Sequence, residues 1–576
     1  MARVRIHQKV VLRRLCRSIT RSGSLGVHAL AFSPIRQKCH MRRSVPVCNN
    51  ACRWRLDHQR TVLGKTPDKP ASRGETELMD KDPDNEIGPK KFTRRTMLAT
   101  GGSLAAAQIA GRIGMRGLAA TLASGTALAQ STKPNIVFIV ADDLGWKDVG
   151  FHGSDIKTPN IDQLAEKGGR LEQFYAQPMC TPTRAALMTG RYPFRYGMQT
   201  AVIPQGGTYG LALDDYLLPE MLKEAGYATA ASGKWHLGHA DTAFWPRQRG
   251  FDSFYGALLG EIDHSTHKSA NGNADWYRNN EAIEEAGFDN ILFATEAVRV
   301  INEHDQSKPL FLYLAFTSPH TPFQAPKEYL DRNSHIADES RRAYAAMISV
   351  MDDGIGRVVE ALETRGMREN TLILFHSDNG GVVDAFFAGE SDVKGKLPAD
   401  NGPYRQGKGT TYEGGTRVVG LINWPGKIEP GSADGMMHVV DMYPTLAALA
   451  GATPGKNKPL DGMDMWPMLG EGKPSPRTEI VYNVEPMTAA VRQGDWKLVW
   501  KTTLPPKVEL FDLSKDRSET TNLADQNPEM VKTLQARVIE LASQMSPPLI
   551  MQDAVRLLLH SDTVLPDAAE MFNVGD

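Results

Sequence analysis

Cysteine is scarce in this chain, and its distribution is uneven. Five cysteines occur in 576 residues, and four of them lie in the first 52: Cys16, Cys39, Cys48 and Cys52. Only Cys180 remains beyond them. Disulfides need pairs, so the main part of the chain cannot be a disulfide-held scaffold. The four early cysteines match no zinc pattern either, because no second Cys or His pair follows at a suitable distance. Cys180 is therefore either inert packing or a reactive or modified centre.

Acidic residues are nearly absent from the N-terminus, where Asp57 is the only one in the first sixty residues, among many arginines and lysines. A basic arm can bind nucleic acid, but this one has little apolar content. The formal net charge of the whole chain is −1, which gives no argument for nucleic-acid or membrane binding. We therefore expect no nucleic-acid partner.

No uninterrupted apolar run is long enough to span a membrane. The longest candidate follows Arg94-Arg95, is rich in Ala, Gly and Leu, and is interrupted by Arg112 and Arg116. It ends in Ala127-Leu128-Ala129 before Gln130, a small-x-small cleavage pattern. Paired arginines, a weak apolar region and this ending predict a twin-arginine export signal, read by the twin-arginine export machinery. The mature protein would be periplasmic or secreted.

The domain boundaries follow from that signal. An export signal should begin near the N-terminus, and Met79 lies a short way upstream of the paired arginines, so we expect residues 1–78 to be an extension with no role in the fold. Residues 1–129 are then extension plus signal, residues 130–445 a large domain, and residues 446–576 a small C-terminal domain.

Four stretches of the large domain are short and almost continuously apolar: residues 135–141, 227–232, 309–317 and 371–377. Such strands are typical of a parallel sheet covered on both faces. Helical patterns lie between them, including a long run over 341–365 that stops at Gly366. This alternation predicts an α/β domain.

The sequence pattern changes after about residue 445, from apolar strands alternating with helices to short strands separated by turns. Short strands with intervening turns are expected at 480–484, 489–492, 495–500 and 508–512, followed by a helix over 528–545. The C-terminal part is predicted to be a small α+β unit, one antiparallel sheet with a helix packed on it.

Polar residues follow each apolar strand of the large domain. They are Asp142 and Asp143, then Lys234 and His236, then His320, and finally Asp378 and Asn379. An Asp after a strand is commonly a turn former or a helix cap, but four strand ends of this kind point to one site, because ligands bind beyond the carboxyl ends of such strands.

The carboxylates and the amide in this set offer only oxygen ligands, which calcium or magnesium prefers over zinc. Clustered carboxylates without a cation would repel one another, so a metal follows from the chemistry if Asp142, Asp143, Asp378 and Asn379 meet. Asp352 and Asp353 lie inside the long helical run, and we expect them on a solvated face.

Cys180 opens Cys180-Thr181-Pro182-Thr183-Arg184. Thr181 suits a helix N-cap and Pro182 the first helical position, which would put Cys180 at the positive end of a helix with Arg184 one turn in.

This pentapeptide resembles the modification signature of the formylglycine-dependent (type I) sulfatases. Further segments resemble sulfatase motifs in their usual order, and their residues are most similar to those of the arylsulfatase B type. These segments are Asp142-Asp143-Leu144-Gly145, Gly233-Lys234-Trp235-His236, Ser377-Asp378-Asn379-Gly380, Gly407-Lys408-Gly409, and a C-terminal Leu510-Phe511-Asp512-Leu513. Thr183 stands where many members have serine, and it keeps a small hydroxyl side chain. The resemblance implies an alkaline-phosphatase-like sandwich with a large mixed, mainly parallel sheet and a smaller C-terminal antiparallel sheet.

The resemblance also implies a mechanism. A formylglycine-generating enzyme would oxidise Cys180 to an aldehyde whose hydrate attacks sulfur with one hydroxyl and expels sulfate through the other. One calcium ion would be held by Asp142, Asp143, Asp378, Asn379 and modified Cys180. Asp378 would accept the attacking proton.

The same resemblance assigns the remaining residues. Arg184, Lys234 and Lys408 would neutralise the developing charges. His236 would take the proton that releases sulfate, and His320, with Lys408, would protonate the leaving oxygen. The substrate would be a sulfated small molecule or saccharide.

Two alternatives stay open from the residues alone. A phosphonate or phosphate ester hydrolase of the same superfamily would use the same groups, because sulfate and phosphate esters share tetrahedral geometry. A non-catalytic binding protein is disfavoured by the intact set of ligands, lysines and histidines.

Overall fold

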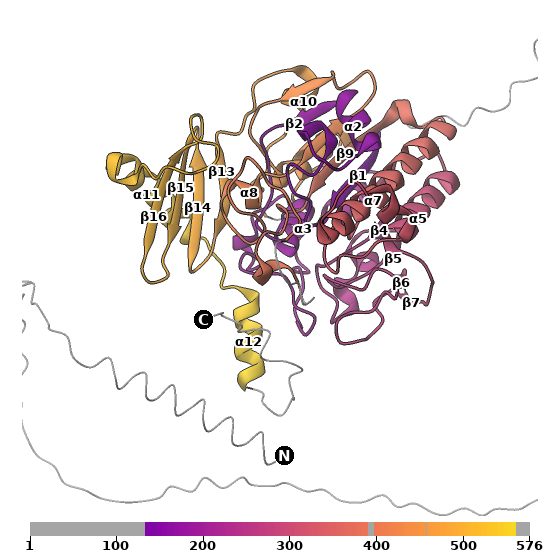
Figure 1. The fold of residues 1–576 in the computed structure, drawn as a ribbon, viewed down its shortest axis with the longest axis horizontal. Coiled ribbons are helices and arrows are strands. Elements are labelled where there is room, and N and C mark those ends of the chain that lie inside the picture. The colour runs from indigo at the N-terminus through magenta and orange to yellow at the C-terminus, as the bar shows by residue number, and fades with distance from the viewer. Residues whose placement is uncertain (1–132, 390–396, 457, 560–576) are drawn as a thin grey trace, which may run out of the picture. The chain divides into compact units, whose positions relative to one another are not determined.

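The computed structural model describes residues 133–389, 397–456 and 458–559. The predicted extension and export signal lie outside these residues. A ten-stranded sheet organises the large domain (Figure 1). Its central strands are β1 (Asn135–Ala141), β4 (Ala228–Gly233), β8 (Leu310–Ala315) and β9 (Thr371–Ser377), at the four predicted positions.

These central strands are parallel, and the edges of the sheet are partly antiparallel. β1 pairs in parallel with β8 and β9, and β4 pairs in parallel with β8 and with β5 (Ser253–Gly256). β10 (Gly420–Asn423) is antiparallel to β9 and to β2 (Gly169–Leu171). The outermost strands are β11 (Gly431–Ala433), β6 (Tyr277–Arg278) and β7 (Glu281–Ala282). The prediction of a mixed, mainly parallel sheet is confirmed.

Both faces of the sheet are covered, as the unbroken apolar strands require. Along β1, Val137 and Ile139 face a core with α2 (Pro159–Glu166), α5 (Asp289–Glu303) and α7 (Glu339–Thr364). Ile136 and Phe138 face the opposite core, which contains α3 (Cys180–Thr189), α4 (Leu218–Glu224) and α9 (Met442–Ala450). Strand residues alternate between the two faces, so one strand contributes to both cores.

The C-terminal sheet is four-stranded and antiparallel, in the order β13 (Glu479–Val484), β14 (Thr488–Gln493), β15 (Trp496–Lys501) and β16 (Lys507–Asp512). Helix α11 (Pro528–Ala542) packs on it through Leu534, Val538 and Leu541. This small α+β arrangement is the predicted one. A further helix, α12 (Leu549–Leu559), follows it and has no counterpart among the predicted elements.

Two local expectations were wrong. α3 begins at Cys180 with Met179 as its N-cap, because the Thr181 hydroxyl is occupied by the Ile203 amide, at 3.2 Å, and by the His236 carbonyl, at 3.1 Å. Asp352 does lie in the long helix, but it is buried and not solvated. It accepts hydrogen bonds from backbone amides at the start of α2.

Within the described ranges, no helix is both long enough and apolar enough to cross a membrane.

Candidate active site

The register of the central strands brings the predicted site residues to one edge of the sheet. Ala141, the last residue of β1, is paired with Ser377, the last of β9, and Gly233 of β4 is paired with Ala315 of β8. The next residues of each strand therefore emerge together. The Asp378 amide donates to the Ala141 carbonyl at 3.0 Å, which fixes the two acidic strand ends side by side.

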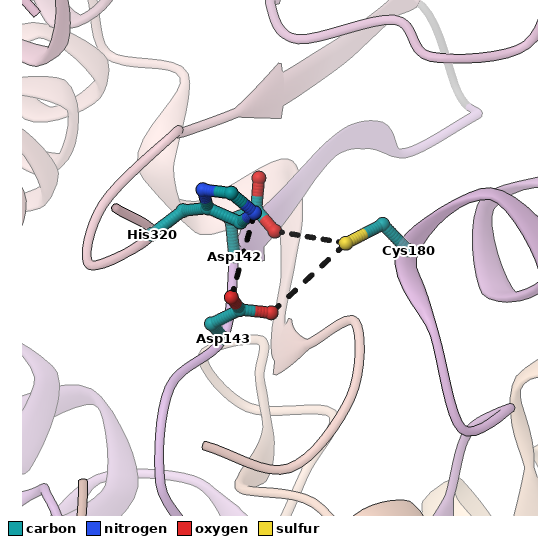
Figure 2. Close-up of side chains that lie close together, drawn as sticks. All are labelled: Asp142, Asp143, Cys180 and His320. Atoms are coloured by element: carbon teal, nitrogen blue, oxygen red, sulfur yellow. Dashed lines mark hydrogen bonds and ion pairs between the residues drawn. The ribbon is translucent and has the colours of Figure 1, made fainter. Parts of the chain in front are cut away.

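Cys180 faces this edge from the first residue of α3. Its side chain is buried, and its Sγ donates to Asp142 Oδ1 at 3.3 Å and lies 4.0 Å from Asp143 Oδ1 (Figure 2). Burial and the charges of Asp142 and Asp378 raise the pKa of the Cys180 thiol well above its usual value. A thiol held in this way is a poor nucleophile, because the reactive form is the thiolate.

The three carboxylates at the site are matched by three buried cations. Lys234 Nζ lies 2.5 Å from Asp142 Oδ2, and Lys408 Nζ lies 2.8 Å from Asp143 Oδ2. Arg184 donates through both Nε and Nη2 to Asp378 Oδ2, at 3.1 and 2.8 Å. The predicted cationic residues therefore all reach the acidic strand ends, each from a different part of the chain.

These charges and burial shift the pKa values of Asp142 and Asp378 in opposite directions. Burial, followed by the charge of Asp142, raises the pKa of Asp378 to about 7. Burial also disfavours the charged form of Asp142, but Lys234, His320 and Arg184 outweigh it and lower the pKa of Asp142 below its ordinary value. The site thus holds one strongly acidic carboxylate next to a more basic one.

The donor set fits a hard divalent cation. Ligand atoms of Asp142, Asp143, Cys180 and His320 lie within 4.8 Å of one another. Asn379 adds a buried carbonyl oxygen that has no hydrogen-bond partner, while its Nδ2 donates to Asp143 Oδ1 at 2.7 Å. An orphaned buried oxygen beside clustered carboxylates suits an ion that prefers oxygen ligands.

The predicted ligand Asp378 is held differently from the others. Its Oδ2 binds Arg184, and its Oδ1 lies 3.3 Å from the Asp143 amide. His320, which was predicted for proton transfer, takes the place of Asp378 in the close group (Figure 2).

The two predicted histidines present opposite ring nitrogens. His320 Nδ1 lies 2.8 Å from the Thr321 carbonyl, which leaves Nε2 facing Asp143 Oδ2 at 3.6 Å. His236 Nε2 lies 3.0 Å from the Ile203 carbonyl, and its buried Nδ1 has no partner. A nitrogen beside a carbonyl must be the donor, so the other nitrogen of each neutral ring is the proton acceptor. Burial is the first cause that lowers the pKa of both imidazoles, followed by Lys408 for His320 and by Lys234 for His236.

Two supporting residues are absent from the sequence predictions. His264 Nε2 lies 3.2 Å from the His320 carbonyl, and its Nδ1 lies 2.9 Å from Asp289, so this pair supports the His320 loop. Gly260 lies against the His236 ring, where an added Cβ would come within 2.2 Å of the imidazole. His264 lies in a His- and Asn-rich stretch, but nothing local connects it to His320.

Cys180, His236, His320 and Lys408 form the floor of a cavity of about 510 Å³. This arrangement combines a residue at a helix N-terminus, a cluster of oxygen ligands, three cations and two buried imidazoles. It is suited to binding a tetrahedral anion and transferring protons around it.

Comparisons with known proteins agree with this geometry. The sequence profile of the sulfatase family matches residues 134–452, and that of the N-sulphoglucosamine sulphohydrolase C-terminal domain matches residues 406–544. Arylsulfatase J of Mus musculus is 38% identical over 395 residues, which cover 66% of this chain and 64% of that protein. N-acetylgalactosamine-6-sulfatase of Homo sapiens is 35% identical over 379 residues, which cover 62% of this chain and 70% of that protein.

A solved structure shows the same similarity in three dimensions. Ps i-CgsB, crystallised in complex with k-i-k-neocarrahexaose, superposes with a TM-score of 0.67 and 33% identity, and the alignment covers 77% of this chain and all of that one. The family profile spans more than half of the chain and includes every predicted site residue. The chain therefore belongs to the sulfatase family of sulfuric ester hydrolases.

Proposed function

We propose that this protein is an exported sulfatase that hydrolyses sulfate esters of a carbohydrate through a formylglycine made from Cys180. The observation that carries the proposal is the position of Cys180, buried at the start of α3 with Sγ between Asp142 and Asp143 on the cavity floor. The raised pKa of the Cys180 thiol disfavours its direct use as a thiolate nucleophile. Oxidation would supply an aldehyde, whose hydrate is an oxygen nucleophile.

The lysines and histidines of the site have separate tasks in this proposal. Lys408 and Lys234 present their ammonium groups beside the carboxylates, where a sulfate oxygen can exchange into their hydrogen bonds. His320 Nε2, aimed at the cluster, would first take up a proton and then donate it to the leaving oxygen, with Lys408 as a second donor. His236 Nδ1, buried without a partner, would accept the proton that accompanies release of sulfate.

A calcium ion is proposed for the oxygen cluster, held by Asp142, Asp143, Asp378, Asn379 and the oxygen on modified residue 180. Its charge would polarise the sulfate and stabilise a bound hydroxyl. Within this set Arg184 keeps Asp378 oriented through two hydrogen bonds.

The carbohydrate assignment rests on the named relatives. N-acetylgalactosamine-6-sulfatase acts, by its name, on a sulfated amino sugar, and Ps i-CgsB binds a neocarrahexaose. We extend this substrate class to the present chain. Export is proposed from the Arg94-Arg95 segment, and N-terminal sequencing of the exported protein should begin at Gln130.

Mass spectrometry of the peptide ending at Arg184 tests the central proposal. Protein made together with a formylglycine-generating enzyme should carry an aldehyde at Cys180 and hydrolyse aryl sulfates faster than the matching aryl phosphates. Cys180→Ala should fold and be inactive, since Cys180 supplies chemistry and little core volume. Full activity with an unmodified thiol would overturn the proposal, and faster phosphate hydrolysis would favour the phosphate ester alternative.

Metal analysis tests the cation separately. We expect stoichiometric calcium in the wild type, and Asp378→Ala should abolish turnover and lower the melting temperature, because Arg184 and the metal would lose a shared partner. Asp331→Ala, at an exposed ion pair with Lys327, is the matched control. Stoichiometric zinc, or an active Asp378→Ala protein, would contradict the assignment.

A further inference from the structure

Asp142 and Asp143 are consecutive residues whose carboxylates reach the same point of the site. Asp142 Oδ1 lies 3.3 Å and Asp143 Oδ1 lies 4.0 Å from Cys180 Sγ (Figure 2). Successive side chains of an extended strand point to opposite faces of the sheet. A chain that simply continued β1 in extended form would therefore separate the two carboxylates.

The backbone of Asp143 leaves the extended conformation at this point. Its φ is +66°, in the left-handed region that residues with a Cβ rarely adopt. Asp tolerates this region better than most residues, but a strained backbone conformation persists only where the surrounding structure holds it. The contacts of the backbone on each side of Asp143 therefore decide whether the two carboxylates can share one site.

Two of these contacts come from the end of β9. The Asp143 amide lies 3.3 Å from Asp378 Oδ1, and the Leu144 amide donates to Ser377 Oγ at 2.9 Å. The Ser377 hydroxyl donates in turn to the Asn379 carbonyl at 2.7 Å. The end of β9 thus holds the backbone at Asp143 and at the residue that follows it.

The next amide, that of Gly145, donates to a different element. Its acceptor is the hydroxyl of Tyr344 on α7, at 3.0 Å, and the Asp143 carbonyl lies 3.3 Å from the same oxygen. Gly145 allows this close approach, because an added Cβ would come within 2.2 Å of Asp148 Oδ2 and 2.5 Å of the Asp400 carbonyl. Tyr344 is buried, so a Gly145 amide without this acceptor would have no water to replace it.

Tyr344 is itself oriented by a buried carboxylate. Its hydroxyl donates to Asp148 Oδ2 at 2.8 Å, and Asp148 Oδ1 accepts from Arg341 Nη1 at 2.6 Å. Arg341 and Tyr344 are three residues apart on α7 and therefore share a face of the helix. Because the hydroxyl has a single proton and directs it to Asp148, its oxygen is left to accept from the Gly145 amide.

The carboxylate of Asp143 is the group that these contacts place. Its Oδ2 lies 2.8 Å from Lys408 Nζ and 3.6 Å from His320 Nε2, and its Oδ1 accepts from Asn379 Nδ2 at 2.7 Å. A shift of the Asp143 backbone would disturb all three contacts at once. Removal of a group that orients a metal ligand typically lowers metal affinity or activity about 10–100-fold.

We propose that Tyr344 is a positioning residue for Asp143. Its hydroxyl, oriented by Asp148 and Arg341, holds the left-handed backbone of Asp143 and so keeps two consecutive carboxylates in one site, where both can bind the proposed calcium ion. The inference rests on the proposed calcium site and adds α7 to the elements that build it.

The test removes one hydroxyl and measures calcium affinity. Tyr344→Phe keeps the aromatic ring, which packs in the core between the sheet and α7. Tyr443→Phe is the matched control, because Tyr443 is a buried tyrosine on α9 whose hydroxyl donates to the Tyr216 carbonyl at 3.1 Å. All proteins are produced with a formylglycine-generating enzyme and stripped of metal. Calorimetric titration with calcium then gives Kd at a temperature where circular dichroism shows each protein to be folded.

The calcium Kd of Tyr344→Phe should rise about tenfold, and kcat/KM for an aryl sulfate should fall at low calcium concentration. The calcium Kd of Tyr443→Phe should stay within about twofold of the wild-type value, although this variant also loses a buried hydrogen bond. An unchanged calcium Kd in folded Tyr344→Phe would overturn the inference. An equal rise in the two variants would also overturn it, because it would show a general loss of stability and not a positioning role.

Asp148→Asn covers the case in which Tyr344→Phe does not fold. It keeps the Tyr344 hydroxyl but replaces its charged acceptor by a neutral amide, so the calcium Kd should again rise. A Kd within about twofold of the wild-type value in this variant would overturn the inference. Wild-type protein that binds no calcium would refute the calcium site and this inference together, whereas turnover of sulfate esters tests the sulfatase proposal by itself. If wild-type protein binds calcium and the variants bind it equally well, only the role of Tyr344 is wrong.

Discussion

Lys497 on β15 is completely buried and forms two ion pairs with carboxylates that are also buried. Its Nζ lies 3.0 Å from Glu413 Oε1 and 2.7 Å from Glu519 Oε1. Glu519 Oε2 accepts the backbone amide of Glu413 at 2.7 Å. Glu413 begins the short helix α8 (Glu413–Thr416), a few residues after Lys408. The network therefore attaches the C-terminal sheet to the segment that carries Lys408.

Lys497→Met should destabilise the fold strongly. The methionine side chain fills similar space but removes the cation that two buried carboxylates share, and only Glu413 keeps another one, Arg417 at 3.5 Å. Breaking a buried ion pair by removing one partner costs about 3–5 kcal/mol. Burial raises the pKa of Glu519 to about 7, so Glu519 can take up a proton and limit the penalty. We therefore expect a loss near the lower end, about 3 kcal/mol of unfolding free energy.

Urea denaturation followed by circular dichroism measures this loss, and turnover of an aryl sulfate shows whether Lys408 is displaced. The double variant Lys497→Met/Glu519→Gln should recover about 1–3 kcal/mol, because it removes one of the uncompensated charges. Lys327→Met is the control, since the Lys327–Asp331 pair is largely exposed and such pairs contribute little.

A loss below about 1 kcal/mol would refute this reasoning, because it would make the buried network no stronger than a surface ion pair. A double variant less stable than Lys497→Met would refute it in a different way. That result would mean that Glu519 contributes through its hydrogen bond to the Glu413 amide, and not through its charge.

Two further predictions concern pH and folding. Because the pKa of Glu519 rises from about 4.5 to about 7 in the fold, the folded state keeps a proton that the unfolded chain loses, so wild-type stability should fall as pH rises across that window. Urea midpoints measured at several pH values should show a flatter profile for Glu519→Gln, and parallel profiles would contradict the assignment. Asp352→Ala should cost about 2 kcal/mol of unfolding free energy, because the Asn160 and Ile161 amides at the start of α2 lose their acceptor. Asp353→Ala, which breaks an ion pair with Arg332, is the control, and a loss no larger than the control's would show that the buried bonds contribute little.

The central sheet could be predicted because its strands are buried on both faces and therefore form unbroken apolar runs. The site could be predicted for the same reason. Asp142 and Asp378 follow β1 and β9 directly, so strand register alone brings them together. The position of a long helix such as α7 could also be predicted from its apolar periodicity. The sequence does not indicate, however, which carboxylate on such a helix is buried.

Tertiary contacts determine the two features that the sequence did not predict, the start of α3 and the burial of Asp352. Thr181 has the side chain of an N-cap, but its hydroxyl is used by Ile203 and His236, so α3 starts earlier. Asp352 looks like a surface residue until α2 supplies its amide donors from far away in the chain. In both cases a polar side chain forms its hydrogen bonds with residues distant in the sequence and not with the neighbouring backbone. Such a partner cannot be identified from the local sequence pattern.

The same physical difference distinguishes the charged residues of the candidate site from the apolar residues that line the cavity. Site residues such as Asp142 and Lys408 belong to charged motifs that contain glycine, and each is paired with a side chain of opposite charge. Met487 and Met551, which line the cavity, are single apolar side chains in two separate segments. Helix α12 brings Met551 there and is held by hydrogen bonds from the Leu549 amide to the Gly197 carbonyl and from the Thr208 hydroxyl to Asp553. Substitution of either methionine leaves no buried charge unpaired, so these positions can change at a smaller cost in unfolding free energy than the charged residues of the site.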